Sequence, residues 1–153
     1  CRRTSNIGGF FRMSKNWFHD MKVMHQKYGV NKWYQAEQQS DVEWRRFNKF
    51  MQFRLGMMQE ELDETKEAFE LKDAPGMVDG IIDLCVFAIG TLEVFGVDAN
   101  KAWDEVYKAN MSKEVGIKEG RPNPLGLPDL VKPDDWQGPV HEDNCGNISD
   151  SFQ

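Results

Sequence analysis

Two acidic stretches decide the fold predicted for this chain: Gln59-Glu60-Glu61-Leu62-Asp63-Glu64 and Asp79-Gly80-Ile81-Ile82-Asp83. Each lies within a longer run whose apolar residues recur three, four or seven positions apart, which is typical of a helix. A helix turns by about 100° per residue, so carboxylates three or four positions apart lie on the same face. Each stretch therefore presents a pair of carboxylates on one side of its helix.

Both pairs interrupt apolar surroundings. Phe50 and Phe53 precede Glu61 and Glu64 on their helix, and the helix of the second pair is otherwise almost entirely apolar. The acidic groups are therefore expected to continue a buried surface. An isolated buried carboxylate is unfavourable by several kcal/mol, so such groups need a cation or a hydrogen-bond partner. Carboxylate oxygens from two helices suit Mg²⁺, with Mn²⁺ as a substitute, and such an ion in turn holds phosphate oxygens.

Two plainer interpretations of these residues remain open. A Glu-Glu-x-x-Glu run is most often a solvated helix face. The two aspartates of the second stretch can also be satisfied by nearby cations, for which the candidates are Arg45, Arg46 and Arg54.

The hydrophobic pattern predicts four helices, over residues 14–28, 40–71, 75–95 and 98–113. Ser14, Ser40 and Asp98 are the predicted N-caps, and Gly29 and Gly96 are the predicted stops. No strand-like alternation is strong, so the fold class is all-α, most simply a four-helix bundle. The residues of the second and fourth helices expected to pack inward are Trp44, Phe47, Met51, Leu55, Met58, Leu62, Phe69, Trp103, Val106 and Tyr107.

We expect three regions along the chain. Residues 1–13 are predicted to be a disordered or non-native leader, because the chain begins with Cys and Met13 is a plausible start. Residues 14–115 form the helical catalytic domain. Residues 116–153 form an irregular arm rich in Pro and Gly, which cannot be a regular helix and which packs on the bundle or on a partner subunit.

Composition excludes several classes of protein. The net charge of -6 argues against a nucleic-acid polymer as partner. Three widely spaced cysteines indicate neither a disulfide framework nor a zinc ribbon, and a reducing cytoplasm is the expected setting. The most apolar run, residues 77–97, is interrupted by Asp79, Asp83 and Glu93, which argues against a membrane span.

The two stretches together resemble the MazG-like all-α nucleoside triphosphate pyrophosphohydrolases, a group that includes bacterial and phage MazG, dimeric dUTPases and phosphoribosyl-ATP pyrophosphohydrolase. Their pattern is Glu-Glu-x-x-Glu on one helix and Glu-x-x-Asp on the next. Glu60, Glu61 and Glu64 match the first part and Asp83 matches the end of the second, whereas Gly80 stands where the second part has glutamate. The segments 83–91, 104–113 and 131–136 and the dipeptide Phe18-His19 are also similar, so the resemblance covers most of residues 14–136.

The resemblance implies Mg²⁺-dependent hydrolysis of a ribo- or deoxyribonucleoside triphosphate to the monophosphate and pyrophosphate. It implies that Glu61, Glu64 and Asp83 are metal ligands, with Asp79 as a fourth. Glu60 would orient or deprotonate the attacking water, or serve as a further ligand.

Candidate substrate-binding residues follow from the same comparison. Asn110 is expected on an inner face, where its amide reads a base or sugar, and Lys113 is expected to meet phosphate charge. Lys132 and Arg54 are weaker candidates for binding phosphate. His19 is a further candidate substrate residue, although a purely structural role in packing fits it equally well.

Two alternatives to this function are kept. The substrate is alternatively phosphoribosyl-ATP, or the chain is a non-catalytic helical module whose long amphipathic helix drives oligomerisation. A homodimer or homotetramer is expected in every case, because four helices with so much apolar surface bury poorly in a monomer.

Overall fold

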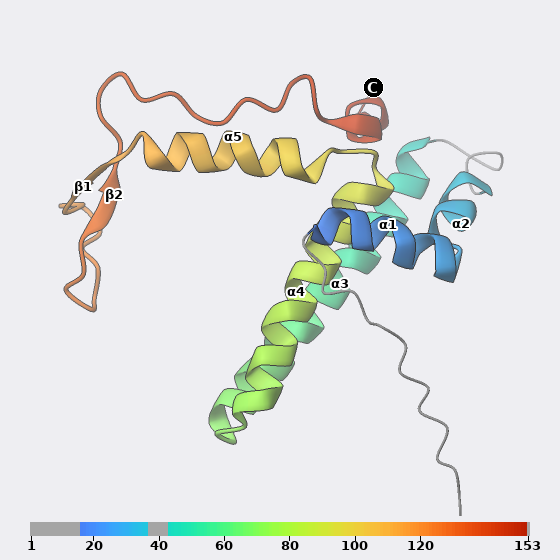
Figure 1. Ribbon diagram of the computed structural model, residues 1–153, viewed down its shortest axis with the longest axis horizontal. Coiled ribbons are helices and arrows are strands. Elements are labelled where there is room, and N and C mark those ends of the chain that lie inside the picture. Colours follow the sequence, from blue (N-terminus) through green and yellow to red (C-terminus); the bar gives the residue numbers. More distant parts are fainter. Residues whose placement is uncertain (1–15, 37–42, 153) are drawn as a thin grey trace, which may run out of the picture.

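The computed structural model describes residues 16–36 and 43–152 and confirms an all-α protein (Figure 1). Its described α-helices are α1 (Trp17–Tyr28), α2 (Val30–Ala36), α3 (Glu43–Glu70), α4 (Ala74–Val94) and α5 (Ala99–Met111). The pattern did not predict α2, which follows directly after Gly29 because the φ of 72° at this glycine lets one helix end and the next begin. The expectations for the leader and for Ser14 and Ser40 as helix starts lie outside the described residues.

Short polar side chains fix the start of two helices. Asn16 precedes α1, and its side chain accepts a hydrogen bond from the backbone N–H of His19 at 3.0 Å. Asp98 is the N-cap of α5, as the sequence predicts, and accepts from the N–H groups of Asn100 and Lys101 at 3.0 and 3.2 Å. These bonds satisfy backbone donors that have no partner within the helix.

The long helices α3 and α4 lie side by side as an antiparallel hairpin (Figure 1). α1 crosses α4 at Gly90, where a Cβ atom would lie only 2.7 Å from Cε of Met21, so a side chain here would push the helices apart. Between α4 and α5 the chain turns by 116°. α5 therefore leaves the hairpin, and the half of the hairpin nearest the α3–α4 turn has no other described helix beside it. No single helix in the described ranges is long and apolar enough to cross a membrane.

The buried core lies at the opposite end of the hairpin, around Phe95. This side chain is 1% exposed, and its ring centroid lies 5.0 Å from that of Phe47, 5.7 Å from that of Phe50 and 5.8 Å from that of Tyr34. Phe152 packs edge-on against Phe47 at 5.2 Å. One aromatic core therefore joins α2, the beginning of α3, the end of α4 and the last described residues.

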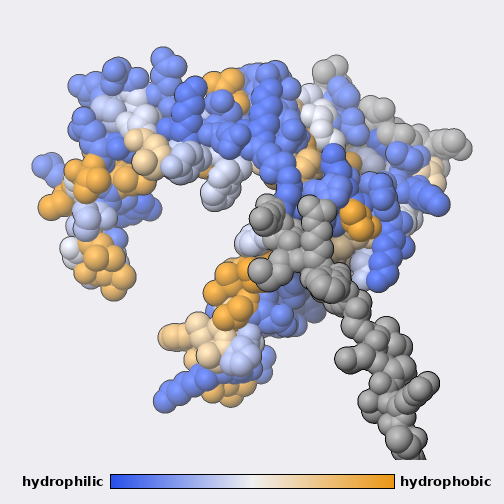
Figure 2. Space-filling view, in the orientation of Figure 1, coloured by the Kyte–Doolittle hydropathy of each residue, from blue (hydrophilic) through white to orange (hydrophobic). Residues whose placement is uncertain are grey.

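Several side chains predicted to pack inward are exposed instead. Phe47 is buried as expected, but Leu55, Leu62 and Phe69 further along α3 are exposed, Phe69 by 68%. The same correction applies to three residues of α5, namely Trp103, Val106 and Tyr107. The reason is that, among the helices that the structure describes, only α4 covers the later part of α3, because α5 has turned away. Figure 2 shows apolar residues gathered on the free half of the hairpin and around the strands that follow α5.

The arm after α5 contains more regular structure than predicted. β1 (Glu114–Gly116) pairs antiparallel with β2 (Asp129–Val131). Lys118, two residues after β1, forms an ion pair with Asp129 of β2, with Nζ 2.9 Å from Oδ1. Two short 3₁₀ helices, η2 (Gly146–Ile148) and η3 (Asp150–Phe152), end the described chain.

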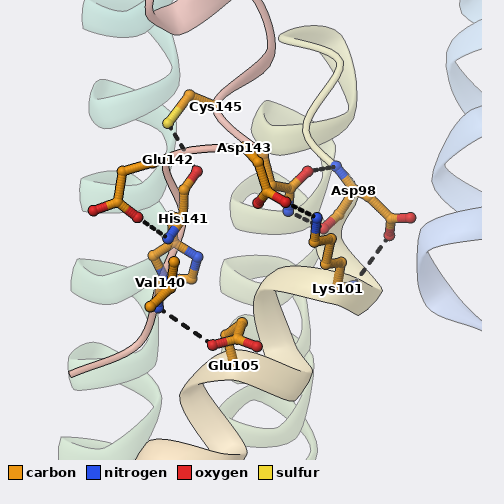
Figure 3. Close-up of polar contacts among 9 residues, drawn as sticks. Asp98, Lys101, Glu105, Val140, His141, Glu142, Asp143 and Cys145 are labelled. Atoms are coloured by element: carbon orange, nitrogen blue, oxygen red, sulfur yellow. Dashed lines mark hydrogen bonds and ion pairs between the residues drawn. The ribbon is translucent and has the colours of Figure 1, made fainter. Parts of the chain in front are cut away.

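Between β2 and η2 the chain returns along α5 (Figures 1 and 3). The side chain of Asn144 donates to the carbonyl of Asp98 and accepts from its N–H, both at 2.9 Å. A Cβ atom at Gly146, whose φ is 52°, would lie 2.1 Å from the carbonyl oxygen of Phe95, so only glycine allows this approach. The arm is thereby fixed to the start of α5 and to the aromatic core.

Candidate functional site

The five carboxylates singled out from the sequence lie on the free half of the hairpin. We call this group the acidic site: Glu60, Glu61 and Glu64 on α3, with Asp79 and Asp83 on α4. Glu61 and Asp83 are half-buried and the other three are exposed. The prediction of a buried surface is therefore wrong for Glu64 and Asp79, because α4 is the only described helix that covers α3 here.

Glu61 is the electrostatic centre of the acidic site. Burial raises the pKa of its carboxyl group, and the negative charges of Asp83, Glu64, Glu60 and Asp79 raise it further, in that order. Each of the four is therefore close enough to oppose ionisation of Glu61. Five acidic groups converge on one region, where a cation would relieve their repulsion.

The donors of the acidic site are all carboxylate oxygens, which are the ligands that Mg²⁺ and Mn²⁺ prefer. As they stand, no three Asp, Glu, His or Cys side chains in the described ranges lie close enough together to hold a metal ion. The three exposed side chains of the site can turn about their χ angles without displacing packed neighbours. The chemistry of the donor set thus fits a hard divalent cation, and ligation requires side-chain rotation.

A second group, which we call the basic cluster, gathers Asn110, Lys113, Lys132 and Trp136. Lys113 Nζ donates to Asn110 Oδ1 at 2.8 Å and lies 5.2 Å from the ring centroid of Trp136. Lys132 Nζ lies 4.2 Å from the same ring, whose Nε1 donates to the carbonyl of Ala109 at 2.8 Å. The structure therefore brings three predicted substrate residues together around one indole, an organising role of Trp136 that sequence reasoning missed.

The basic cluster lies apart from the acidic site of the same chain. It surrounds the C-terminal end of α5, which points away from the hairpin (Figure 1). The 13 residues of α5 span about 20 Å at about 1.5 Å per residue. One chain therefore presents its acidic groups and its cationic groups at separate places.

The two remaining predicted substrate residues lie elsewhere. His19 is exposed on α1. Arg54 is only 6% exposed; its Nη2 lies 3.4 Å from Nε2 of His25, and burial lowers the pKa of its guanidinium. The rings of Phe50 and Phe87 lie 4.9 and 5.6 Å from its Cζ.

Sequence reasoning also missed a buried polar group beside Arg54. Nδ1 of His25 on α1 meets Oε2 of Glu93 on α4, and Nδ2 of Asn31 on α2 donates to Oε1 of Glu93 at 3.3 Å. Because Arg54 can only donate, Nε2 of His25 must accept, which assigns the ring proton to Nδ1. This network fixes α1 and α2 on the hairpin. The sequence feature that could have indicated this buried polar group is Glu93, a carboxylate in a largely apolar helix.

The all-α fold and a family match over more than half of the chain define the class of protein: an all-α pyrophosphohydrolase. The sequence profile described as phosphoribosyl-ATP pyrophosphohydrolase matches residues 23–110, from α1 to the last turn of α5 and including the whole acidic site. The chain belongs to this family, and with it to the wider MazG-like all-α superfamily. No curated protein sequence matches the chain.

The repulsion at Glu61 predicts a gain in stability when its charge is removed. A carboxyl group whose pKa is raised in the folded state holds its proton more tightly there than in the unfolded chain. Its ionisation therefore lowers the free energy of unfolding as the pH rises through the folded pKa. Glu61→Gln should be more stable than the wild type at neutral pH without divalent ions, and the gain should disappear below about pH 4. Urea unfolding across this pH range measures the difference.

Asp63→Asn is the matched control on the same helix. Hydrogen bonds from Lys66 and Gln59 lower the pKa of Asp63, so loss of this charge should reduce stability at neutral pH. Loss of stability in both variants would contradict the electrostatic assignment of Glu61.

Proposed function

We propose that the protein is a divalent-metal-dependent nucleoside triphosphate pyrophosphohydrolase. It would convert a ribo- or deoxyribonucleoside triphosphate and water into the monophosphate and pyrophosphate. The observation that carries the proposal is the gathering of the five acidic residues on the paired helices α3 and α4, within the segment that the family profile matches.

The acidic site supplies the residues for a metal and a water molecule. Glu61, Glu64 and Asp83 would hold Mg²⁺ or Mn²⁺, with Asp79 as a fourth ligand. A bound divalent ion supplies positive charge for the phosphate oxygens and for the departing pyrophosphate. Glu60 is exposed beside these ligands, and we assign it to orienting or deprotonating the water that attacks the α-phosphorus.

The basic cluster supplies contacts to the rest of the nucleotide. Lys113 and Lys132 are cations that both lie near the Trp136 ring. Two cations near one ring are suited to phosphate charge, and Asn110 offers an amide to a base or sugar. Because this cluster lies apart from the acidic site of its own chain, the substrate would bridge two copies. The exposed apolar side chains of the hairpin and of α5 also favour a homodimer or homotetramer.

A second candidate substrate is phosphoribosyl-ATP, the compound that the description of the matching family names. Its hydrolysis breaks the same α–β phosphoanhydride bond. The acidic site therefore serves either substrate, and discrimination falls to residues that contact the base and sugar.

The test is pyrophosphate release from the four ribo- and four deoxyribonucleoside triphosphates and from phosphoribosyl-ATP, each with Mg²⁺ and with a chelator. Mg²⁺-dependent release from a triphosphate supports the proposal and identifies the nucleotide pool. Pyrophosphate release from phosphoribosyl-ATP and from no triphosphate would show that phosphoribosyl-ATP is the substrate. No release from any compound would overturn the proposal in favour of a non-catalytic oligomerisation module.

A further inference from the structure

Gly80 is a point of close approach between the two helices of the acidic site. It is buried on α4 between exposed Asp79 and Ile81. A Cβ atom at this position would lie 2.4 Å from Thr65 Oγ1, 3.3 Å from the carbonyl oxygen of Glu61 and 3.5 Å from Thr65 Cα. Carbon and oxygen atoms do not approach to 2.4 Å, so any side chain at position 80 requires α3 or Thr65 to move.

Thr65 can move aside only by losing a hydrogen bond. Its Oγ1 donates to the carbonyl of Glu61 at 2.8 Å, one turn earlier on α3. A β-branched side chain has few rotamers in a helix, so rotation away from Gly80 also breaks this bond. The carbonyl that receives the bond belongs to Glu61, the residue on which the acidic site converges.

We propose that the Gly80–Thr65 contact is a spacer that sets the distance between the acidic groups of α3 and those of α4. Gly80 and Thr65 are then positioning residues for the divalent cation, an inference that rests on the proposed function. The spacer lies within one helical turn of Glu61 and Glu64 on one side and of Asp79 and Asp83 on the other. A metal site tolerates little change in ligand separation, because Mg²⁺ requires nearly ideal geometry.

The spacer leads us to expect an unusual effect when a carboxylate is added at position 80. A further carboxylate near a cation site ordinarily strengthens binding. Gly80→Glu should weaken it, because the Cβ atom alone forces the helices apart before the carboxylate can contribute.

The experiment measures Mn²⁺ binding in the absence of nucleotide, by calorimetry and by electron paramagnetic resonance. We expect Gly80→Ala and Gly80→Glu to bind Mn²⁺ about 10- to 100-fold more weakly than the wild type. The double variant Gly80→Ala/Thr65→Ala lacks Oγ1, so the nearest neighbours of the new Cβ are the Glu61 carbonyl oxygen at 3.3 Å and Cα of residue 65 at 3.5 Å. Its affinity should return to near that of the wild type, although it carries one more substitution.

Gly56→Ala is the matched control, because Gly56 is exposed on α3 with nothing within 4 Å of its Cβ position. It should leave Mn²⁺ affinity unchanged. If Gly80→Ala binds Mn²⁺ as tightly as the wild type, the spacer is overturned and the proposed function is left intact. The same conclusion follows if the double variant binds Mn²⁺ no better than Gly80→Ala. A wild-type protein that binds no Mn²⁺ would overturn the proposed function and the spacer with it. If Gly80→Ala does not fold, the double variant still decides, since it removes the 2.4 Å contact and leaves a carbonyl oxygen at 3.3 Å as the nearest atom.

Discussion

Asp83→Asn is expected to reduce Mg²⁺-dependent pyrophosphate release by at least about 100-fold, because removal of one preorganised charge from a reacting centre has effects of this size. The two side chains have nearly the same shape, so the half-buried position on α4 stays filled. What is lost is a negative oxygen that faces Glu61 and, in the proposed mechanism, a metal ligand. Steady-state rates over a range of Mg²⁺ concentrations measure the effect.

Asp63→Asn serves again as the control for activity. Asp63 is exposed on α3 and is paired with Lys66 at 2.7 Å, outside the acidic site. The same Asp-to-Asn change should therefore leave the rate within a few-fold of the wild type. Equal losses in both variants would show that the overall charge of the hairpin, and not the acidic site, supports the reaction.

Phe95→Ala is expected to lower the free energy of unfolding by about 3–5 kcal/mol, the range for deletion of a buried phenylalanine. Phe95 is the most deeply buried aromatic side chain in the described ranges and contacts the rings of Tyr34, Phe47 and Phe50. Its loss leaves a cavity where α2, α3, α4 and the arm meet. Urea unfolding followed by circular dichroism at fixed protein concentration measures the change.

Phe69→Ala is the control for this substitution. Phe69 is 68% exposed near the end of α3, so it loses little buried surface within one chain. If Phe69→Ala lowers the free energy of unfolding as much as Phe95→Ala does, Phe69 lies in an interface between copies. The aromatic core is then not the main source of stability.

Hydrophobic periodicity was sufficient to predict α1, α3, α4 and α5, but it predicted neither α2 nor which helices pack together. The stops at Gly29 and the cap at Asp98 are local features, and the structure confirms both. The depth of burial is not local: Phe47 and Phe69 share one predicted stripe, yet only Phe47 is covered. The 116° turn before α5 depends on packing around the aromatic core, and nothing in the spacing of residues specifies it.

The acidic site could be predicted because its members are close in sequence within two adjacent helices. Charges three or four positions apart must share a face, and a short connection makes the two faces neighbours. The basic cluster and the His25–Glu93 pair join distant segments, so spacing alone does not reveal them. Gly80 illustrates the remaining difficulty, since its importance comes from the atoms of Thr65 that occupy the place of its missing side chain.

The unequal coverage of the hairpin gives its two ends different local stabilities. At one end the helices share an aromatic core with α2 and the arm. At the other end, within residues 16–36 and 43–152, the two helices are covered only by each other. Backbone amides near Phe95 should open only with global unfolding, whereas those of the acidic half should open in smaller, more frequent fluctuations. In the proposed mechanism, the chemistry would thus take place in the more easily opened part of the molecule, and a bound ion or a second copy would add order to it.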